Sequence, residues 1–441
     1  MDAEPLAFSE GIPQKDRPMT DPPPNPSTGI FRALRHRNFR LFASGQMISL
    51  IGTWMQTVAQ SWLVYRLTGS AMQLGMVGFA SQIPIFLVVP FGGLVADRFD
   101  RRSILFKTQT AAMLLAGLLA ALTLSEQIQV WHLYVLAILL GVANAFDIPT
   151  RQAFTVQMVG REDLPNAISL NSSMVNGARM VGPALAGVLV GWVGEGWCFL
   201  GNSLSYLAVL AGLAAMRLPP WRPTPQQGNA AQNLREGFTF VMRCRPIRDL
   251  LLMLGLVSLM ASPHVVLMPI FAEEILGGGA HALGLMLGMS GAGAVVGALI
   301  LASRRALAGS STWIAVSGAT LGLGTIAFAL SRSLELSCLL MLPIGFSMMT
   351  QMALSNTLVQ AMVPDRLRGR VMAFHSMMFM GMAPLGALLS GALAPILGAP
   401  GTVVLGGVLL LAGAAVFTWR LPGFRVEARL VTREARIGNS A

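Results

Sequence analysis

Three charged side chains lie deep within apolar stretches of this sequence. Asp147, Arg151 and Arg179 are surrounded mainly by Ala, Val, Leu, Met and Gly. On membrane-insertion scales, a charged residue in the middle of a helix costs about 3 kcal/mol, so each of the three is a candidate functional group. A carboxylate held among cations can bind and release a proton or exchange ion-pair partners, and both events switch the site between two charge states.

The spacing of these residues predicts how they meet. Asp147 and Arg151 are four residues apart, so they share one face of a helix and can form an ion pair. Arg179 and Asp147 stand at similar distances from a turn expected near Glu162, on opposite arms of a hairpin. We therefore predict a buried network of all three, in which Asp147 is the protonated group or the switch of a conformational transition. A purely structural salt bridge is the alternative.

The hairpin that carries these charges occurs twice in the chain. Shifting the numbering by 204 residues places a second copy on the segment from Gly141 to Gly187 without a gap. The second copy has Gln351, Ser355 and Ala383 where the first has charges, so the same scaffold forms without them. We infer that the charged triad serves more than architecture. The matching glycines are the pairs Gly141/Gly345, Gly177/Gly381, Gly182/Gly386 and Gly187/Gly391.

The composition places the chain in a bilayer. Of its 441 residues 54% are hydrophobic, 12% are charged and 47 are Gly, which is outside the range of soluble globular domains. The formal net charge of +11 comes from Lys and Arg in alternate loops and both terminal segments, as the positive-inside rule describes. This distribution argues against a nucleic-acid partner, because no single basic face results. The three cysteines have neither metal-ligand nor disulfide spacing, so no metal site is predicted.

We predict an all-α membrane protein with twelve transmembrane helices. Twelve apolar stretches approach the ~20 residues that cross a bilayer. An even number agrees with basic residues at both ends of the chain, so both termini should be cytoplasmic and the protein should lie in the inner (plasma) membrane. The predicted spans are 41–65, 74–96, 103–124, 131–157, 166–194, 197–216, 249–276, 281–303, 311–331, 334–362, 370–398 and 401–420.

A proline-rich segment between the sixth and seventh spans divides the chain. It continues with Leu234, Phe238 and Val241 at helical spacing, which indicates a linker followed by an amphipathic helix on the cytoplasmic surface. Repeated six-helix bundles are typical of secondary transporters. The predicted domains are a disordered cytoplasmic tail (1–29), a six-helix bundle (30–217), the linker with its amphipathic helix (218–248), a second six-helix bundle (249–421) and a basic cytoplasmic tail (422–441).

The loop after the second span reads GGLVADRFDRR, from Gly92 to Arg102. It resembles the loop signature of the major facilitator superfamily, a glycine followed by Asp-Arg and a basic pair. The resemblance implies the fold of that superfamily, two pseudo-symmetric six-helix bundles, with close helix packing at the glycine and a conformational latch of Asp and Arg residues. A positive-inside cluster with two incidental acids is the alternative. The matching positions are Gly93, Asp97, Arg98, Arg101 and Arg102.

The fifth span contains NGARMVGPALAG, which resembles the Gly-Pro signature of proton-driven exporters in the superfamily. The resemblance implies that this span meets the eighth, GLMLGMSGAGAVVGAL, in a dry contact between the halves that limits leakage. Glycines let backbones approach closely, and a proline removes one helix donor. Ordinary helix packing is the alternative, because small-residue stripes are common in membrane helices. The matching positions are Gly177, Gly182, Pro183 and Gly187.

Two further stretches, Phe31–Ser70 and Phe146–Phe154, resemble the branch of the superfamily that contains the enterobactin exporter and the transmembrane secretion effectors. Neutral polar residues within the spans are candidates for the lining of a central cavity or for hydrogen bonds between helices. The lining candidates are Gln46, Thr53, Gln56, Gln60, Gln82, Asn144, Asn202, Gln351, Asn356 and His375.

These observations predict a secondary transporter rather than an enzyme. The sequence has no phosphate-binding GxxxxGKS/T loop, no HExxH and no GxSxG, so no cofactor is expected and a proton gradient is the expected energy source. We expect efflux of a small amphipathic molecule, a siderophore or a drug, by alternating access and proton antiport, from a monomer in the lipid bilayer. A proton-coupled symporter for nutrient uptake and a lysophospholipid flippase are the alternatives.

Overall fold

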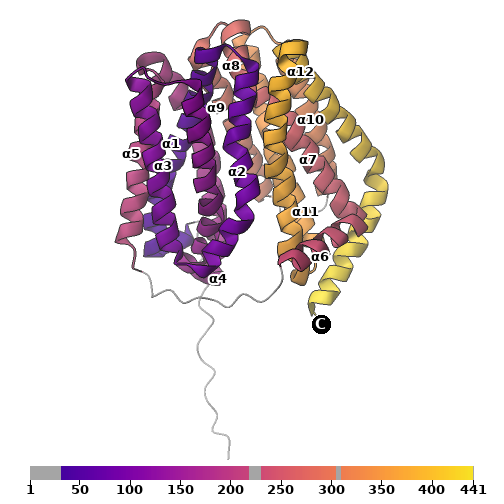
Figure 1. Ribbon diagram of the computed structural model, residues 1–441. Coiled ribbons are helices and arrows are strands. Elements are labelled where there is room, and N and C mark those ends of the chain that lie inside the picture. Colours follow the sequence, from indigo (N-terminus) through magenta and orange to yellow (C-terminus); the bar gives the residue numbers. More distant parts are fainter. Residues whose placement is uncertain (1–30, 218–229, 304–308, 441) are drawn as a thin grey trace, which may run out of the picture.

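The computed structural model describes residues 31–217, 230–303 and 309–440. Within these ranges the chain is all-helical and contains no strand. The predicted N-terminal tail (1–29) lies outside the described residues, and so does the segment 218–229 of the predicted linker. Figure 1 shows the long helices side by side, running from one end of the molecule to the other.

The first part of the chain forms helices whose ends have identifiable caps. The side chain of Ser70 accepts from Gln73 N at the start of α2, and Asp100 accepts from Ser103 N at the start of α3, so each satisfies a free backbone donor. The elements are η1 (Arg32–Arg35), α1 (Arg37–Thr68), α2 (Ala71–Arg98), α3 (Arg101–Leu124), α4 (Val130–Val193) and α5 (Glu195–Ala215).

The second part of the chain begins with the amphipathic helix expected from the spacing of Phe238 and Val241. It also contains a π-helical turn, η2, where the seventh predicted span ends. The elements are α6 (Ala230–Arg243), α7 (Arg245–Val266), α8 (Met268–Ile270), η2 (Phe271–Ile275), α9 (Gly279–Ser303), α10 (Ser310–Leu330), α11 (Leu334–Met362) and α12 (Asp365–Ser440).

Two of the long elements are broken by a glycine. Gly160 in α4 has φ 72° and Gly398 in α12 has φ 74°, a backbone region that glycine enters without steric penalty. The two arms of α4 are Val130–Gly160 and Glu162–Val193. In α12 the break falls where one predicted span ends, and the residues predicted as a basic tail continue the helix to Ser440.

Ten helical segments of the described ranges are long and apolar enough to cross a membrane. One of them, Leu367–Thr432, has 66 residues and contains the break at Gly398, whereas one crossing needs ~20 residues. α1 is not among the ten, although it has 32 residues. Its basic and amide side chains lower its mean hydropathy.

The helices form two groups. α1 to α5 pack against one another as the first helix group, and α6, α7 and α9 to α12 pack as the second. Contacts of α4 with α9 and of α2 with α12 join the groups. α6 is fixed to the second group, because Glu236 pairs with Arg370 and the rings of Phe238 and Phe374 lie 6.0 Å apart.

The long helices define two ends of the molecule, which are named here for use below. The linker end contains Gly160 and α6 and lies at the bottom of Figure 1. The far end, at the top, contains the turn from α1 to α2 and the break at Gly398.

Candidate functional site

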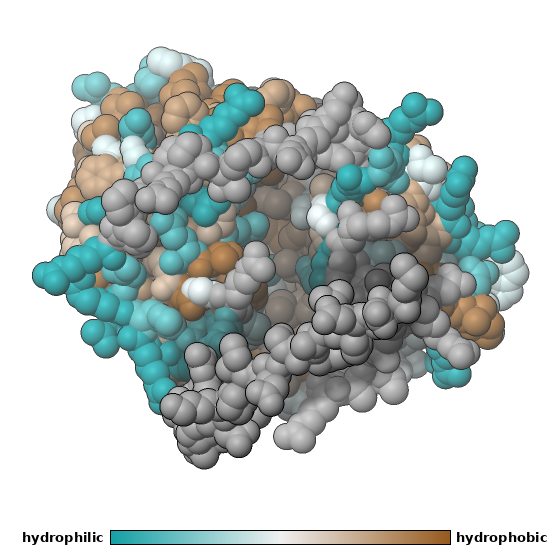
Figure 2. Space-filling view, turned by 90° about the horizontal axis from the view of Figure 1, so that it is seen from below, coloured by the Kyte–Doolittle hydropathy of each residue, from teal (hydrophilic) through white to brown (hydrophobic). Residues whose placement is uncertain are grey.

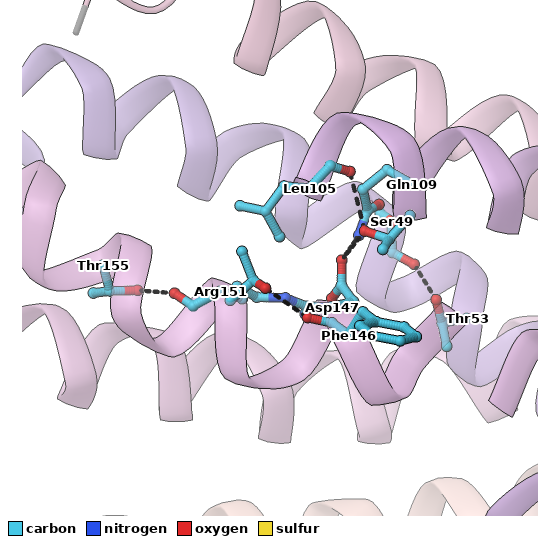
Figure 3. Close-up of polar contacts among 10 residues, drawn as sticks. Ser49, Thr53, Leu105, Gln109, Phe146, Asp147, Arg151 and Thr155 are labelled. Atoms are coloured by element: carbon cyan, nitrogen blue, oxygen red, sulfur yellow. Dashed lines mark hydrogen bonds and ion pairs between the residues drawn. The ribbon is translucent and has the colours of Figure 1, made fainter. Parts of the chain in front are cut away.

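Asp147 and Arg151 form an ion pair on the first arm of α4 (Figure 3). Four residues separate them, so one helical turn brings Nη2 of Arg151 onto Oδ2 of Asp147. Asp147 is only 2% exposed, whereas the side chain of Arg151 is 24% exposed. The exposed part of the pair is therefore on the arginine side.

The other carboxylate oxygen of Asp147 is held by α3. Thr108 Oγ1 lies 3.0 Å and Gln109 Nε2 lies 2.8 Å from Oδ1. With Arg151, three donors contact two oxygens, which suits an ionised carboxylate because that group only accepts hydrogen bonds. Sequence reasoning missed Thr108 and Gln109. Their only signal is polarity within an otherwise apolar span.

Thr108 can serve both charge states of Asp147. Its Oγ1 lies 3.1 Å from Leu105 O as well as 3.0 Å from Asp147 Oδ1. A hydroxyl has one proton and two acceptor positions. It can therefore donate to the ionised carboxylate, or donate to Leu105 O and accept from a protonated carboxyl group. The backbone need not move between the two arrangements.

Arg179 does not join the pair, so the expected three-residue network does not form. Its guanidinium carbon lies 5.4 Å from the ring centroid of Trp54 on α1, and Nη2 lies 3.7 Å from Sδ of Met348 on α11. The reason is the position of the turn. Counted from Gly160, Asp147 and Arg179 differ by six residues in their distance from the break, an offset of about 9 Å along the helix axes.

The predicted latch residues lie at the linker end, where α2 leads into α3. Arg101 lies 3.7 Å from Asp97 and donates to Ala96 O at 3.2 Å. Arg102 donates to Ala214 O at 3.0 Å, and Arg98 is exposed. These contacts lie within the first helix group, and the role of the residues as a latch stays a prediction.

Close packing in this loop signature belongs to Gly92 and not to Gly93. A Cβ atom at Gly93 would meet no atom within 4 Å, whereas one at Gly92 would lie 2.2 Å from Ala145 O on α4. The resemblance placed the close helix contact at Gly93, but the structure places it at the preceding residue, Gly92. The two neighbours point to different sides of α2, and only Gly92 faces α4.

The glycines of the second arm of α4 contact two different helices. A Cβ atom at Gly182 would lie 2.8 Å from Ile51 O on α1, and one at Gly187 would lie 2.9 Å from Gly284 Cα on α9. Pro183 O lies 2.6 Å from the Cβ position of Gly284. Gly177 has no atom within 4 Å of its Cβ position. The expected contact between the fifth and eighth spans thus rests on Gly187 and Gly284.

The second copy of the hairpin repeats this arrangement. A Cβ atom at Gly391 on α12 would lie 3.1 Å from Gly75 Cα on α2, just as Gly187 meets Gly284. A Cβ atom at Gly386 would lie 2.3 Å from Leu259 O on α7, the counterpart of Gly182 on α1. Two equivalent glycine crossings therefore join the helix groups. Each lies within about two turns of the far end.

The two ends of the molecule differ. Figure 2 looks onto the linker end and shows a hollow between the helix groups, with hydrophobic side chains in its depth. At the far end, the Tyr65 hydroxyl of α1 donates to Oε1 of Glu274 in η2 at 2.8 Å. The structure makes Glu274 part of a hydrogen bond between the groups.

Half of the predicted cavity-lining residues lie instead in the packed interior. Asn202 Nδ2 donates to Gln56 Oε1 at 2.6 Å between α5 and α1, and Gln351 Nε2 donates to Ile314 O at 3.0 Å. These two hydrogen bonds join helices within the packed interior, whereas Gln46 Oε1 and His375 Nε2 are buried without a hydrogen-bond partner among the described residues. The residues corrected in this way, each at most 6% exposed, are Gln46, Gln56, Asn202, Gln351 and His375. Those still half-buried or exposed are Thr53, Gln60, Gln82, Asn144 and Asn356.

The chain matches the transmembrane secretion effector family of the major facilitator superfamily over residues 28–435. It belongs to this family. The predicted membership of the major facilitator superfamily is confirmed, and the protein is a multi-pass membrane transporter rather than an enzyme.

Two named transporters are similar in sequence to this chain. The staphyloferrin A transporter of Staphylococcus aureus is 23% identical over 379 residues, covering 86% of this chain and 95% of that protein. The enterobactin exporter EntS of Salmonella paratyphi A is 26% identical over 388 residues, covering 85% and 92%.

Solved structures share the fold. The nucleoside transporter NupG has a TM-score of 0.68 at 15% identity, covering 88% of this chain and 99% of that chain. A bacterial homologue of the human lysosomal transporter Spinster, in an inward-facing and unoccupied conformation, has a TM-score of 0.64 at 14% identity, covering 91% and 98%. At these identities the likeness concerns the fold alone.

Proposed function

We propose that this protein exports a small amphipathic molecule of the siderophore or drug type across the inner membrane by alternating access, in exchange for protons. The chain crosses the membrane twelve times, as two six-helix halves at 30–217 and 249–421 joined by the linker and α6. Both termini and the linker end are cytoplasmic, and the hollow opens inward. The protein works as a monomer and needs no cofactor.

One observation carries this proposal. Two glycine crossings, Gly187 with Gly284 and Gly75 with Gly391, join the helix groups at the far end, while the linker end is hollowed. At these crossings glycine backbones touch directly, so they close the cleft without side chains that interlock. Such contacts can separate when the two halves rock against each other. Rocking would open the far end and close the linker end around a cargo held between them.

The Asp147 site supports proton coupling. It lies on the first arm of α4, it is buried, and its Thr108 partner accommodates either charge state. A proton that binds Asp147 weakens its attraction to Arg151, so proton binding and conformation are linked. The second copy of the hairpin has no charged residue at the matching positions, so only the first copy can bind a proton there.

The relatives support the cargo class and the direction. One is a staphyloferrin A transporter and another an enterobactin exporter, and both names denote siderophores. The Gly-Pro stripe of α4, typical of proton-driven exporters, favours export over uptake.

Inverted inner-membrane vesicles test the proposal. Their cytoplasmic face is outward, so an exporter accumulates a labelled siderophore or a fluorescent drug when a proton gradient, acidic inside, is applied. We expect accumulation that stops when a protonophore collapses the gradient. Accumulation that ignores the gradient contradicts antiport, and gradient-driven accumulation only in right-side-out vesicles, acidic outside, identifies an uptake symporter. Transfer of a labelled lysophospholipid between leaflets, without cargo accumulation, identifies a flippase.

A further inference from the structure

Arg179 lies where the two helix groups meet. It is half-buried on the second arm of α4, and its guanidinium contacts Trp54 of its own group and Met348 of the other. Its backbone is equally close to the second group, since a Cβ atom at Gly291 would lie 2.6 Å from Arg179 O. The residue therefore lies at the contact between the two groups.

Among the described residues, Arg179 contacts no carboxylate. Its contacts are an aromatic ring and a thioether, whereas Arg151 pairs with Asp147 and Arg66 pairs with Glu195. A cation that is partly withdrawn from water without a counter-ion loses part of its hydration and gains no ion pair in return. A protein that keeps such a cation at a central position gains from it only when an anion arrives.

A second buried polar group stands near Arg179. His264 on α7 is 1% exposed, and its ring interacts with the backbone of Ala261 and electrostatically with Arg179. A guanidinium without a carboxylate partner, with a polar imidazole in its surroundings, suits a ligand with oxygen atoms.

We propose that Arg179, Trp54 and Met348 form a subsite for the anionic group of an aromatic or otherwise planar cargo, such as a carboxylate or a catecholate. The guanidinium offers a planar fork that matches a carboxylate in two hydrogen bonds. The Trp54 ring provides a flat face, and the flexible thioether of Met348 adapts to cargo of different shape. This proposal rests on the proposed function, whose substrate class it defines as anionic.

The position explains why cargo binding and rocking are linked. Trp54 and Arg179 belong to the first group and Met348 to the second, so cargo bound here contacts both. An anion also neutralises the guanidinium of Arg179, whose backbone lies against Gly291 of the second group. The loaded subsite therefore meets a smaller electrostatic barrier when the far end opens.

Binding to the full-length protein in lipid nanodiscs tests the subsite. The probes are 2,3-dihydroxybenzoate and 2,3-dihydroxybenzamide, which have the same ring and differ in charge, and isothermal titration calorimetry measures both. We expect the wild type to bind the anion more tightly. Arg179→Gln should weaken binding of the anion by at least about tenfold and change binding of the amide by less than about twofold, as expected for one lost charged hydrogen-bonding partner.

Two further variants keep the test independent of folding. Arg179→Lys retains the charge and should bind the anion with an intermediate affinity. Lys107→Gln removes an exposed cation from α3 and should bind both probes as the wild type does. If Arg179→Gln does not fold, Trp54→Leu replaces it and should weaken binding of both aromatic probes while preserving the preference for the anion.

Equal affinity of the wild type for the two probes overturns the subsite, and so does unchanged anion binding by Arg179→Gln. The vesicle assay with a neutral dye separates this outcome from failure of the proposed function. Gradient-driven transport of the dye together with equal probe affinities leaves export standing without the subsite. Anion binding that depends on Arg179, in a wild type that accumulates no cargo, leaves the subsite standing without export.

Discussion

Asp147 is bound on Oδ2 by a cation and on Oδ1 by neutral donors. A proton on Oδ1 finds an acceptor in Thr108 and removes the charge that attracts Arg151. The ion pair thus weakens before either side chain moves. Proton binding can then precede a conformational step, and the partly exposed side chain of Arg151 has room to turn away.

We predict that Asp147→Asn abolishes gradient-driven accumulation in vesicles, lowering it at least about tenfold, because the site can no longer change charge. It should also lower the free energy of unfolding by about 2 kcal/mol, since Arg151 is left without its partner at a largely buried position. Thermal unfolding and the vesicle assay measure the two effects.

The double variant Asp147→Asn, Arg151→Gln separates a coupling role from a structural salt bridge. Removing both charges should restore most of the lost stability. Accumulation should stay low. Recovery of gradient-driven accumulation in the double variant would assign the pair to architecture alone.

Residue-level prediction from the sequence succeeded where the contact is local. The Asp147 and Arg151 pair follows from a spacing of four residues on one helix. Thr108 and Gln109 approach Asp147 from another helix, and nothing in their own span reveals that. Arg179 was assigned to the pair because the turn was placed two residues late, and the resulting axial offset is enough to prevent the contact.

At the scale of elements, the glycines of α4 divide according to what they touch. Gly182 allows α1 to approach and Gly187 allows α9 to approach. At Gly177, an added Cβ atom would have no other atom within 4 Å. The sequence shows one stripe of glycines, and only the packing distinguishes its members. The same is true of Gly92 and Gly93 in α2.

We predict that Gly187→Ala lowers the transport rate at least about fivefold, whereas Gly177→Ala changes it by less than about twofold. The added methyl group at position 187 overlaps Gly284, and overpacking of this kind costs about 1–3 kcal/mol. Initial rates in vesicles measure the difference. Equal rates for the two variants would contradict the assignment of the crossing as the closure of the far end.

The hydrogen bond from Tyr65 to Glu274 joins α1 to η2 across the groups, so Tyr65→Phe should favour opening of the far end by about 1 kcal/mol, the contribution of one hydrogen bond. Tyr134→Phe is the matched control, because the Tyr134 hydroxyl donates to Gln73 within the first group. Spin labels at Leu67 and Leu276 report the opening. The distance distribution should lengthen in Tyr65→Phe only, and an identical shift in both variants would exclude a gate at Tyr65.

At the scale of the whole molecule, the helices form two groups, and α6 belongs to the second group. The ion pair of Glu236 with Arg370 and the close approach of Gly237 to Arg370 attach α6 to α12. The sequence predicted the amphipathic character of α6, but not the group that carries it, because Arg370 is distant in the chain.

We predict that two co-expressed fragments, 1–222 and 223–441, assemble and transport within about threefold of the intact protein. A cut between Arg243 and Cys244 leaves α6 on the wrong fragment and should reduce transport further. Vesicle accumulation and co-purification of the fragments measure both. Equal activity of the two pairs would show that the attachment of α6 to α12 is dispensable.

The two glycine crossings also affect the energy barrier to the conformational change. Backbone meets backbone at Gly187 with Gly284 and at Gly75 with Gly391, so no side chain has to climb over another when the groups turn. The two crossings can therefore part with little steric friction when the far end opens. The barrier to that separation comes from polar contacts beside the crossings, such as the one from Tyr65 to Glu274, and evolution can adjust the speed of the cycle by changing such contacts without repacking a core.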